Sequence, residues 1–195
     1  MIRLDVVRRG HGLKHKLMLG LGRLVIGADP PDILRVLFHR HDLWGKPVGV
    51  LTDAVLRGPS EWSVGERELF ATYVSAKNAC RFCTVAHQGI AGQALGKELV
   101  DRVVATGDAP GLSDKARVAL PFVEKLTLEP ERVTAADLEP LRRAGISNDA
   151  IVDLAYVVML FCMYNRIVDA MGCEPVPPDQ VAAVAHMLLE KGYDI

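Results

Sequence analysis

Helix start and stop signals along the whole chain constrain the fold more than any other feature. Ser63 followed by Glu66 is a capping box, and Thr134 followed by Asp137 is a second helix start of the same kind. Glycines stand where the apolar periodic segments should end, at Gly58, Gly107, Gly145 and Gly172. No stretch alternates strictly between apolar and polar residues, and no Asn-Gly hairpin signal occurs. The sequence therefore predicts an all-α fold.

The composition narrows the class of protein. The chain has 195 residues, of which 50% are hydrophobic and 24% charged, with a formal net charge of −1. We therefore expect one globular helical domain over residues 1–195, with its core at roughly 60–107. Near-neutral charge without basic clusters argues against nucleic acid as a partner. Arg23 interrupts the N-terminal apolar run, so we expect no signal peptide, no membrane partner and a cytoplasmic protein.

Two of the four cysteines stand close together, and a histidine follows them. On a helix, Cys80, Cys83 and His87 fall at spacings of three and four residues and share one face. The segment "KNA" before Cys80 predicts a break between two helices, which places Cys80 near a helix N-terminus, where thiolate is favoured. Cys162 and Cys173 have no such spacing and are interpreted as packing residues.

Several kinds of chemistry compete for this cysteine pair. A structural zinc site needs a fourth ligand, and the chain has no second C-x-x-C or H-x-x-x-H motif. A c-type haem needs histidine directly after the second cysteine, where Thr84 stands, and a thioredoxin fold needs strands. The remaining histidines lack ligand spacing and read as scattered: His11, His15, His39, His41 and His186. A catalytic dithiol is favoured, and a redox-sensing or zinc-binding helical scaffold is the alternative.

A dithiol peroxidase requires particular groups. One thiolate attacks the peroxide oxygen and becomes a sulfenic acid, and a second thiol condenses with that acid to form a disulfide. His87 can serve as the base that takes the first thiol's proton. A carboxylate from another helix would orient the histidine, although spacing alone does not select it.

The pattern formed by Glu68, Cys80, Cys83 and His87, within "ELFATYVSAKNACRFCTVAH", resembles the signature of the AhpD-like alkylhydroperoxidases. These belong to the carboxymuconolactone decarboxylase superfamily, and the resemblance spans roughly residues 29–176. It implies an AhpD-like helical fold, with Cys83 as the peroxidatic cysteine, Cys80 as the resolving one, and His87 and Glu68 as the proton relay. It also implies trimers or hexamers and a thiol or lipoyl-type dithiol as the reductant, with no bound cofactor or metal.

The chain departs from that pattern at one position. Mycobacterial-type members carry a second histidine directly before the second cysteine, and Phe82 stands there instead. The relay implied by the resemblance therefore lacks one histidine. Ser75 lies seven residues after Glu68 on nearly the same helical face, so it is a candidate hydrogen-bonding residue of the site. The decarboxylase branch lacks the cysteine pair, so decarboxylation is not expected.

Overall fold

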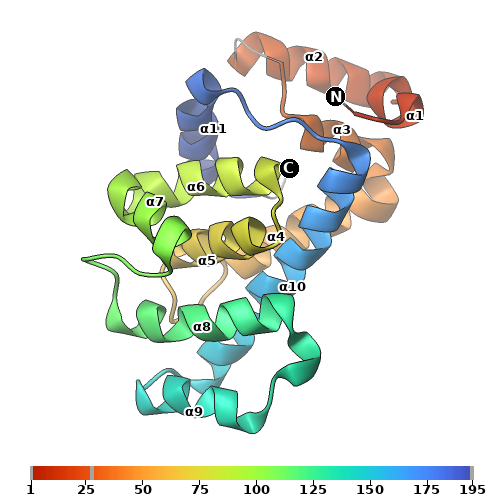
Figure 1. Cartoon of the computed structure of the whole chain (residues 1–195). Coiled ribbons are helices and arrows are strands. Elements are labelled where there is room, and N and C mark those ends of the chain that lie inside the picture. Colours follow the sequence, from red (N-terminus) through yellow and green to blue (C-terminus); the bar gives the residue numbers. More distant parts are fainter. Residues whose placement is uncertain (1, 27–28, 194–195) are drawn as a thin grey trace.

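The computed structural model describes residues 2–26 and 29–193, and within them it contains helices and no strand (Figure 1). The all-α prediction is confirmed. The helices are α1 (Asp5–Arg9), α2 (Leu13–Ile26), α3 (Asp32–His39), α4 (Lys46–Arg57), α5 (Val64–Lys77), α6 (Arg81–Leu95), α7 (Lys97–Thr106), α8 (Asp114–Leu128), α9 (Ala135–Arg143), α10 (Asn148–Met171) and α11 (Pro178–Lys191). A π-helical turn, His41–Gly45, joins α3 to α4, and a 3₁₀ turn, Pro130–Arg132, precedes α9.

The predicted helix boundaries are confirmed where the capping signals are strongest. The Ser63 hydroxyl accepts the Glu66 backbone N–H at 3.2 Å, and the Glu66 carboxylate accepts the Ser63 backbone N–H at 3.0 Å. Gly107 ends α7 and Gly172 ends α10, both in the left-handed region at φ 79° and 72°. These local signals set the ends of the helices independently of tertiary packing.

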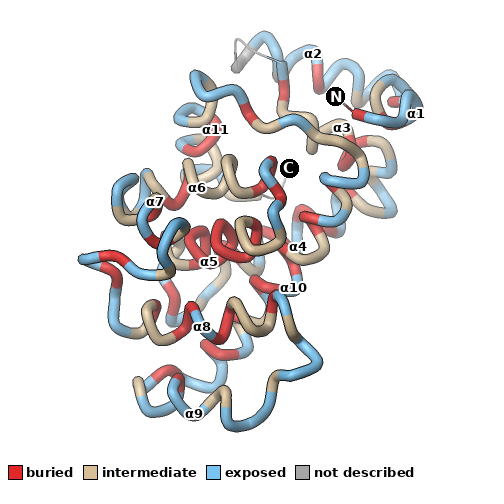
Figure 2. The backbone as a smooth tube through the Cα atoms, viewed as in Figure 1, coloured by how far each residue is buried: buried red, intermediate tan, exposed pale blue. Residues whose placement is uncertain are grey.

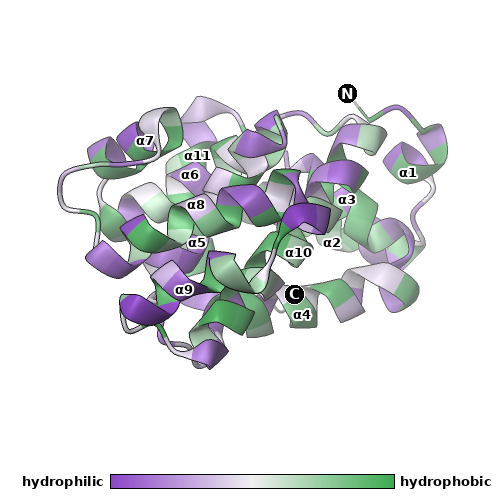
Figure 3. Cartoon of the chain, turned by 60° about the horizontal axis from the view of Figure 1, so that its bottom comes forward, coloured by the Kyte–Doolittle hydropathy of each residue, from purple (hydrophilic) through white to green (hydrophobic). Residues whose placement is uncertain are grey.

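Helix α5 is the centre of the core and is buried along most of its length (Figure 2). Leu69, Phe70 and Val74 have no exposed surface. The helix packs against α6, α10 and α8, and hydrophobic and hydrophilic residues alternate along the helices of the chain rather than separating into different segments (Figure 3). The helices from α3 to α10 therefore each contribute buried apolar residues to one shared core.

Helix α10 is apolar along most of its length and is deeply buried on one side. Leu154, Leu160 and Phe161 are buried in the main core, whereas Tyr156 and Met159 are about half exposed. Among the described residues, α10 is long and apolar enough to cross a membrane by length and composition, and half of that window is buried inside the protein. Its contacts with α5, α8 and α4 make it a core helix.

The N-terminal helices are packed less densely than the rest. Ile2, Val7 and Val36 form a small separate cluster that joins α1 to α3. Helix α2 lies at one end of the molecule (Figure 1), and four of its leucines are mostly exposed: Leu13, Leu17, Leu21 and Leu24. That the chain forms a single domain, with its core near residues 60–107, stays a prediction.

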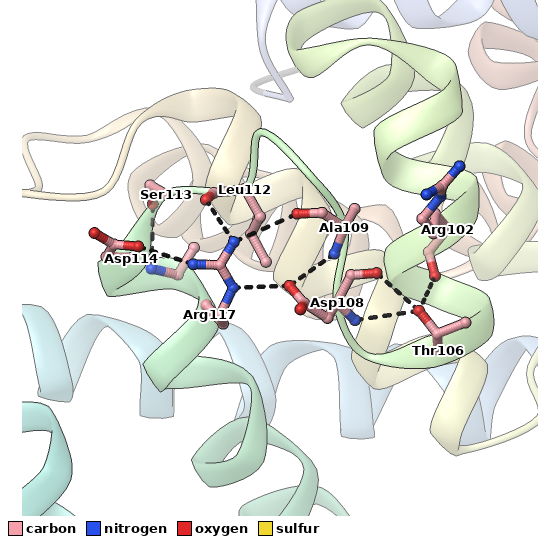
Figure 4. A network of polar contacts seen from close by, with 9 residues as sticks. Arg102, Thr106, Asp108, Ala109, Leu112, Ser113, Asp114 and Arg117 are labelled. Atoms are coloured by element: carbon pink, nitrogen blue, oxygen red, sulfur yellow. Dashed lines mark hydrogen bonds and ion pairs between the residues drawn. The ribbon is translucent and has the colours of Figure 1, made fainter.

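The connection between α7 and α8 is fixed by one arginine (Figure 4). The Arg117 guanidinium contacts the Asp108 carboxylate and the Asp114 carboxylate, each at 2.8 Å. It also donates to the backbone carbonyls of Ala109 and Leu112. This network orders a loop on the surface, away from the cysteines.

Candidate functional site

The two cysteines lie at the turn between α5 and α6. Helix α5 ends at Lys77, Ala79 adopts φ 58°, and Cys80 is the N-cap of α6 with φ −80° and ψ 95°. The Cys80 backbone N–H donates to the Ser75 carbonyl at 2.9 Å. A left-handed conformation at a non-glycine residue is costly, so Ala79 stores local strain beside the cysteine pair. The predicted break at "KNA" and the position of Cys80 at a helix N-terminus are confirmed.

The carboxylate that spacing could not select is Glu68, on α5. Its side chain is completely buried, and its Oε2 lies 2.7 Å from the His87 Nδ1 on α6. Its Oε1 forms an ion pair with the Arg57 guanidinium at 2.8 Å and accepts a hydrogen bond from the Tyr193 hydroxyl at 2.9 Å. Burial acts to raise the pKa of Glu68, but the His87 ring and the Arg57 guanidinium outweigh burial and lower that pKa. The buried carboxylate is thus held ionised.

These contacts fix the orientation of the His87 ring. An ionised carboxylate only accepts hydrogen bonds, so the 2.7 Å contact assigns a proton to Nδ1 of His87. The ring also packs edge-on against Phe161, with centroids 4.5 Å apart. The second ring nitrogen, Nε2, is then the one that can accept a proton from a neighbouring group.

Cys80 and Cys83 are both buried and both free thiols. The hydrogen bond with the Cys83 thiol lowers the pKa of Cys80, and the Cys83 backbone N–H lowers it further, against burial and the nearby Asp169 carboxylate. The same hydrogen bond, together with burial, raises the pKa of Cys83 well above its ordinary value. Cys80, at the N-terminus of α6, is therefore the more readily ionised thiol of the pair, as the helix dipole favours.

A cavity of about 230 Å³ opens beside Cys83 and His87, and Cys80 does not line it. Its walls are almost entirely apolar, and they include Phe82, Phe161 and Tyr164. Phe82, the residue that departs from the mycobacterial-type pattern, thus contributes a hydrophobic side chain to the wall. The prediction that Cys80, Cys83 and His87 share one face is only partly right, because Cys80 caps the helix and faces Asp169 rather than the cavity.

A chain of polar side chains lies behind the cysteines. Ser75 is completely buried, donates to the Ala71 carbonyl at 2.8 Å, and accepts the Asn165 amide at 3.1 Å. Asn165 also accepts the Asn78 amide at 2.9 Å, and its own amide acts to lower the pKa of Cys83. Ser75 therefore reaches the cysteines through Asn165, in addition to bonding within its own helix.

The prediction that the other histidines are scattered is wrong for four of them. His15 lies 5.0 Å from His41 and 5.1 Å from Phe38 between ring centroids, and His11 lies 6.4 Å from His39. His41 begins the π-helical turn after α3 and its ring lies near His15 on α2, a proximity that sequence spacing does not reveal. Within residues 2–26 and 29–193, no three His, Cys, Asp or Glu side chains are arranged to hold a metal ion, and that includes the cysteine site.

Two residues of the site escape sequence reasoning. Arg57 reads as the basic last turn of a helix that stops at Gly58, and Tyr193 reads as part of a terminal segment. Only the fold brings both to Glu68. A buried carboxylate needs a positively charged partner, so the sequence can suggest that an arginine or lysine lies near Glu68. It does not indicate which residue that is.

No family model matches the chain, and no curated protein matches it. Among solved structures, an uncharacterized peroxidase-related protein from Silicibacter sp. TM1040 has a TM-score of 0.77 at 26% identity, over 90% of this chain and 92% of that one. A second, from Ralstonia eutropha JMP134, is described as an alkylhydroperoxidase AhpD core and has a TM-score of 0.76 at 24% identity, over 90% and 91%. The debrominase Bmp8 has a TM-score of 0.68 at 16% identity, over 95% and 94%.

Proposed function

From the premise that this chain has the AhpD-like fold and is similar to peroxidase-related proteins, we propose that it is an oxidoreductase that reduces hydroperoxides through a Cys80/Cys83 dithiol. The observation that carries the proposal is that Cys83, one of two buried free thiols, lines an apolar cavity together with His87, which is paired with Glu68. Cys83 is the peroxidatic cysteine, because it lines the cavity together with His87. Cys80 is the resolving cysteine, because it stands outside the cavity and adjoins Cys83.

The proposed cycle has three stages: oxidation of Cys83, closure of the disulfide and reduction by an external thiol. His87 Nε2 takes the thiol proton of Cys83, and the sulfur attacks the distal peroxide oxygen, so that the O–O bond breaks and Cys83 becomes a sulfenic acid. The same proton returns to the leaving alkoxide, which departs as an alcohol. The Cys80 thiol then loses its proton and its sulfur attacks the Cys83 sulfur, and the hydroxide that leaves takes up that proton and departs as water. An external thiol or dithiol, of which a lipoyl group is one example, reduces the disulfide and restores both thiols.

The charge distribution within the pair bears on this assignment. The pKa directions make Cys80 the more readily ionised thiol, whereas the cavity lies beside Cys83. The cavity favours Cys83 as the peroxidatic cysteine, because a peroxide must reach the sulfur that it oxidises. His87 is then needed to deprotonate Cys83, and the lowered pKa of Cys80 favours rapid closure of the disulfide.

Steady-state peroxide consumption with a dithiol reductant tests the proposal. We expect turnover in the wild type, none in Cys83→Ser, and a rate reduced about a hundredfold or more in His87→Ala, within the range for loss of a general base. In Cys80→Ser, a sulfenic acid trap such as dimedone should label Cys83. Labelling of Cys80 in Cys83→Ser with retained turnover would reverse the two roles. Oxidation of the wild type without turnover would favour a redox sensor, and one bound zinc per chain would favour a metal scaffold.

Removal of a halogen from an apolar ring is a second candidate, favoured by the aromatic cavity wall beside a dithiol. A structure of a Bmp8 variant, with a cysteine replaced by alanine, contains 2,3,4-tribromopyrrole. In this chain, a cysteine sulfur would take the bromine and the ring would gain a proton. The second thiol would then release bromide and form the disulfide. Bromide release measured with a brominated pyrrole, in parallel with peroxide consumption, separates the two candidates.

We also propose that the protein is a homo-oligomer, a trimer or a hexamer, in a reducing compartment such as the cytoplasm. Exposed apolar side chains on α10, among them Tyr156 and Met159, support an interface between copies. Two free buried thiols fit a compartment that keeps cysteines reduced. Light scattering of the purified protein measures the oligomeric state directly, and a monomer would contradict this part of the proposal.

A further inference from the structure

The last described residues of the chain lie against one stripe of α4. Gly49, Asp53 and Arg57 stand four residues apart, so they share one face of that helix. The Tyr193 backbone N–H donates to the Asp53 carboxylate at 2.8 Å. A Cβ on Gly49 would come within 3.2 Å of the Tyr193 carbonyl oxygen, so glycine leaves the room that this segment needs.

Gly192 makes the turn that brings Tyr193 to α4. It adopts φ 72° and ψ −155°, a conformation that is essentially restricted to glycine. A Cβ at this position would lie 2.2 Å from an Asp53 carboxylate oxygen. The segment after α11 is thus shaped to dock on α4 at a defined place.

The Tyr193 side chain then reaches the centre of the site. Its hydroxyl donates to Glu68 Oε1 at 2.9 Å and lies 3.5 Å from His87 Nδ1. Its ring stacks on His87 with centroids 6.1 Å apart and planes 23° apart, and the Arg57 guanidinium lies 4.8 Å from the ring centroid. The same ring forms part of the wall of the 230 Å³ cavity.

The pattern of acceptors explains what this arrangement does. Arg57 and Tyr193 both bond Glu68 Oε1, which leaves Oε2 facing His87. With Oε1 occupied, the carboxylate cannot rotate without breaking two bonds, and His87 Nδ1 has a single well-placed acceptor. Without the Tyr193 hydroxyl, the Glu68 carboxylate gains freedom to turn. The tyrosine ring that stacks on His87 then loses the hydrogen bond that holds it in place, and the tautomer of His87 is no longer fixed.

We propose that Tyr193 is a positioning residue: docked on α4 by the Gly192 turn, it holds the Glu68 carboxylate so that His87 keeps its proton on Nδ1 and presents Nε2 to the cavity. The inference rests on the proposed function for its kinetic consequence, but the tautomer of His87 is a property of the protein alone. Tyr193 also closes one wall of the cavity, so loss of its ring should alter substrate binding separately from loss of its hydroxyl.

Two variants of Tyr193 and one control test this role. Tyr193→Phe removes only the hydroxyl, Tyr193→Ala removes the ring as well, and Tyr156→Phe makes the same hydroxyl deletion at a half-exposed tyrosine on α10 that lies outside the site. The first readout is the ¹⁵N chemical shifts of the His87 ring in the reduced full-length protein. We expect the Nδ1–H tautomer in the wild type and in Tyr156→Phe, and a mixture of tautomers in Tyr193→Phe.

The second readout is steady-state peroxide turnover, resolved into kcat and KM. In Tyr193→Phe we expect kcat to fall about tenfold with KM nearly unchanged, because only a fraction of the molecules then present Nε2 of His87 to the cavity. In Tyr193→Ala, KM should rise as well. A wild-type tautomer and an unchanged kcat in folded Tyr193→Phe would overturn the inference, even if Tyr193→Ala fails to fold. Absence of turnover in the wild type would overturn the proposed function, and the tautomer measurement would still decide the role of Tyr193.

Discussion

Helices α5 and α2 contain similar numbers of residues, yet they hold their apolar side chains in opposite ways. Leu69 on α5 has no exposed surface, whereas Leu17 on α2 is 73% exposed. The α5 helix carries Glu68 and Ser75 inside the core, where both side chains have no exposed surface. The candidate site is therefore built on a fully buried helix, whereas most leucines of α2 lie in solvent.

The largest effect should come from Glu68→Gln. The substitution leaves the Arg57 guanidinium without its buried counter-charge, so we expect the free energy of unfolding to fall by about 3 to 5 kcal/mol. We also expect peroxide turnover to fall at least a hundredfold. Denaturant titration and steady-state kinetics measure the two effects, and a variant as stable as the wild type would mean that the buried ion pair contributes nothing.

Leu69→Ala should come next, because it removes a fully buried side chain from the same helix. We expect it to lower the free energy of unfolding by about 2 to 5 kcal/mol. Peroxide turnover per folded molecule should stay at the wild-type level. Urea denaturation at pH 7 measures the change. A decrease in the free energy of unfolding below about 1 kcal/mol would show that the core around α5 relaxes easily and is not tightly packed.

Acidification should separate the two regions. Burial, with the nearby charges of Arg35, His39 and His15, lowers the pKa of His11 from its ordinary value of 6.5. His11 then binds a proton more tightly when the N-terminal helices are unfolded than when they are packed on the protein. The free energy of local unfolding around α2 should therefore decline as pH falls below about 6.5. The pKa of Glu68 is lowered from 4.5, so its contribution to the core is present above that pH and is lost only at lower pH.

Hydrogen exchange at pH 7 and pH 5.5 measures this difference. Amides of residues 13–26 should lose protection at pH 5.5, while amides of α5 and α6 keep theirs. In His11→Phe, the loss between the two pH values should be smaller. Equal loss of protection in α2 and α5 would mean that the molecule opens as one unit.

The smallest effect should come from Leu17→Ala on α2. The side chain is mostly in solvent, so the free energy of unfolding of the isolated chain should change by no more than about 0.5 kcal/mol. This is the matched counterpart of Leu69→Ala, with the same atoms removed from the other region. A cost above about 2 kcal/mol would show that Leu17 is covered in solution, for instance by a second copy of the chain.

Much of the architecture could be predicted from local signals. The capping box at Ser63, the break before Cys80 and the glycines after α7 and α10 act through nearby backbone groups, so sequence alone reveals them. The pairing of Glu68 with His87 was accessible only through the family resemblance, since the residues lie on different helices. Arg57 and Tyr193 were missed because their arrival at Glu68 depends on how α4 and the chain after α11 pack, which no local pattern encodes.

The histidines and the cysteines illustrate the same limit. His11 lies near His39, and His15 lies near His41, because the segment around α2 packs beside α3 and the π-helical turn, a packing that has no sequence signature of its own. Cys80 and Cys83 were placed on one helical face by their spacing. The N-cap conformation of Cys80, with ψ 95°, instead turns that residue away from the cavity. Such small backbone departures decide which sulfur lines the cavity.

The most direct test of the central claim is the intact mass of the reduced protein after one equivalent of hydroperoxide, followed by peptide mapping. The account predicts a loss of two hydrogens per chain, mapped to a Cys80–Cys83 disulfide and reversed by a dithiol. An unchanged mass with both thiols free, or oxidation confined to Cys162 or Cys173, would contradict it.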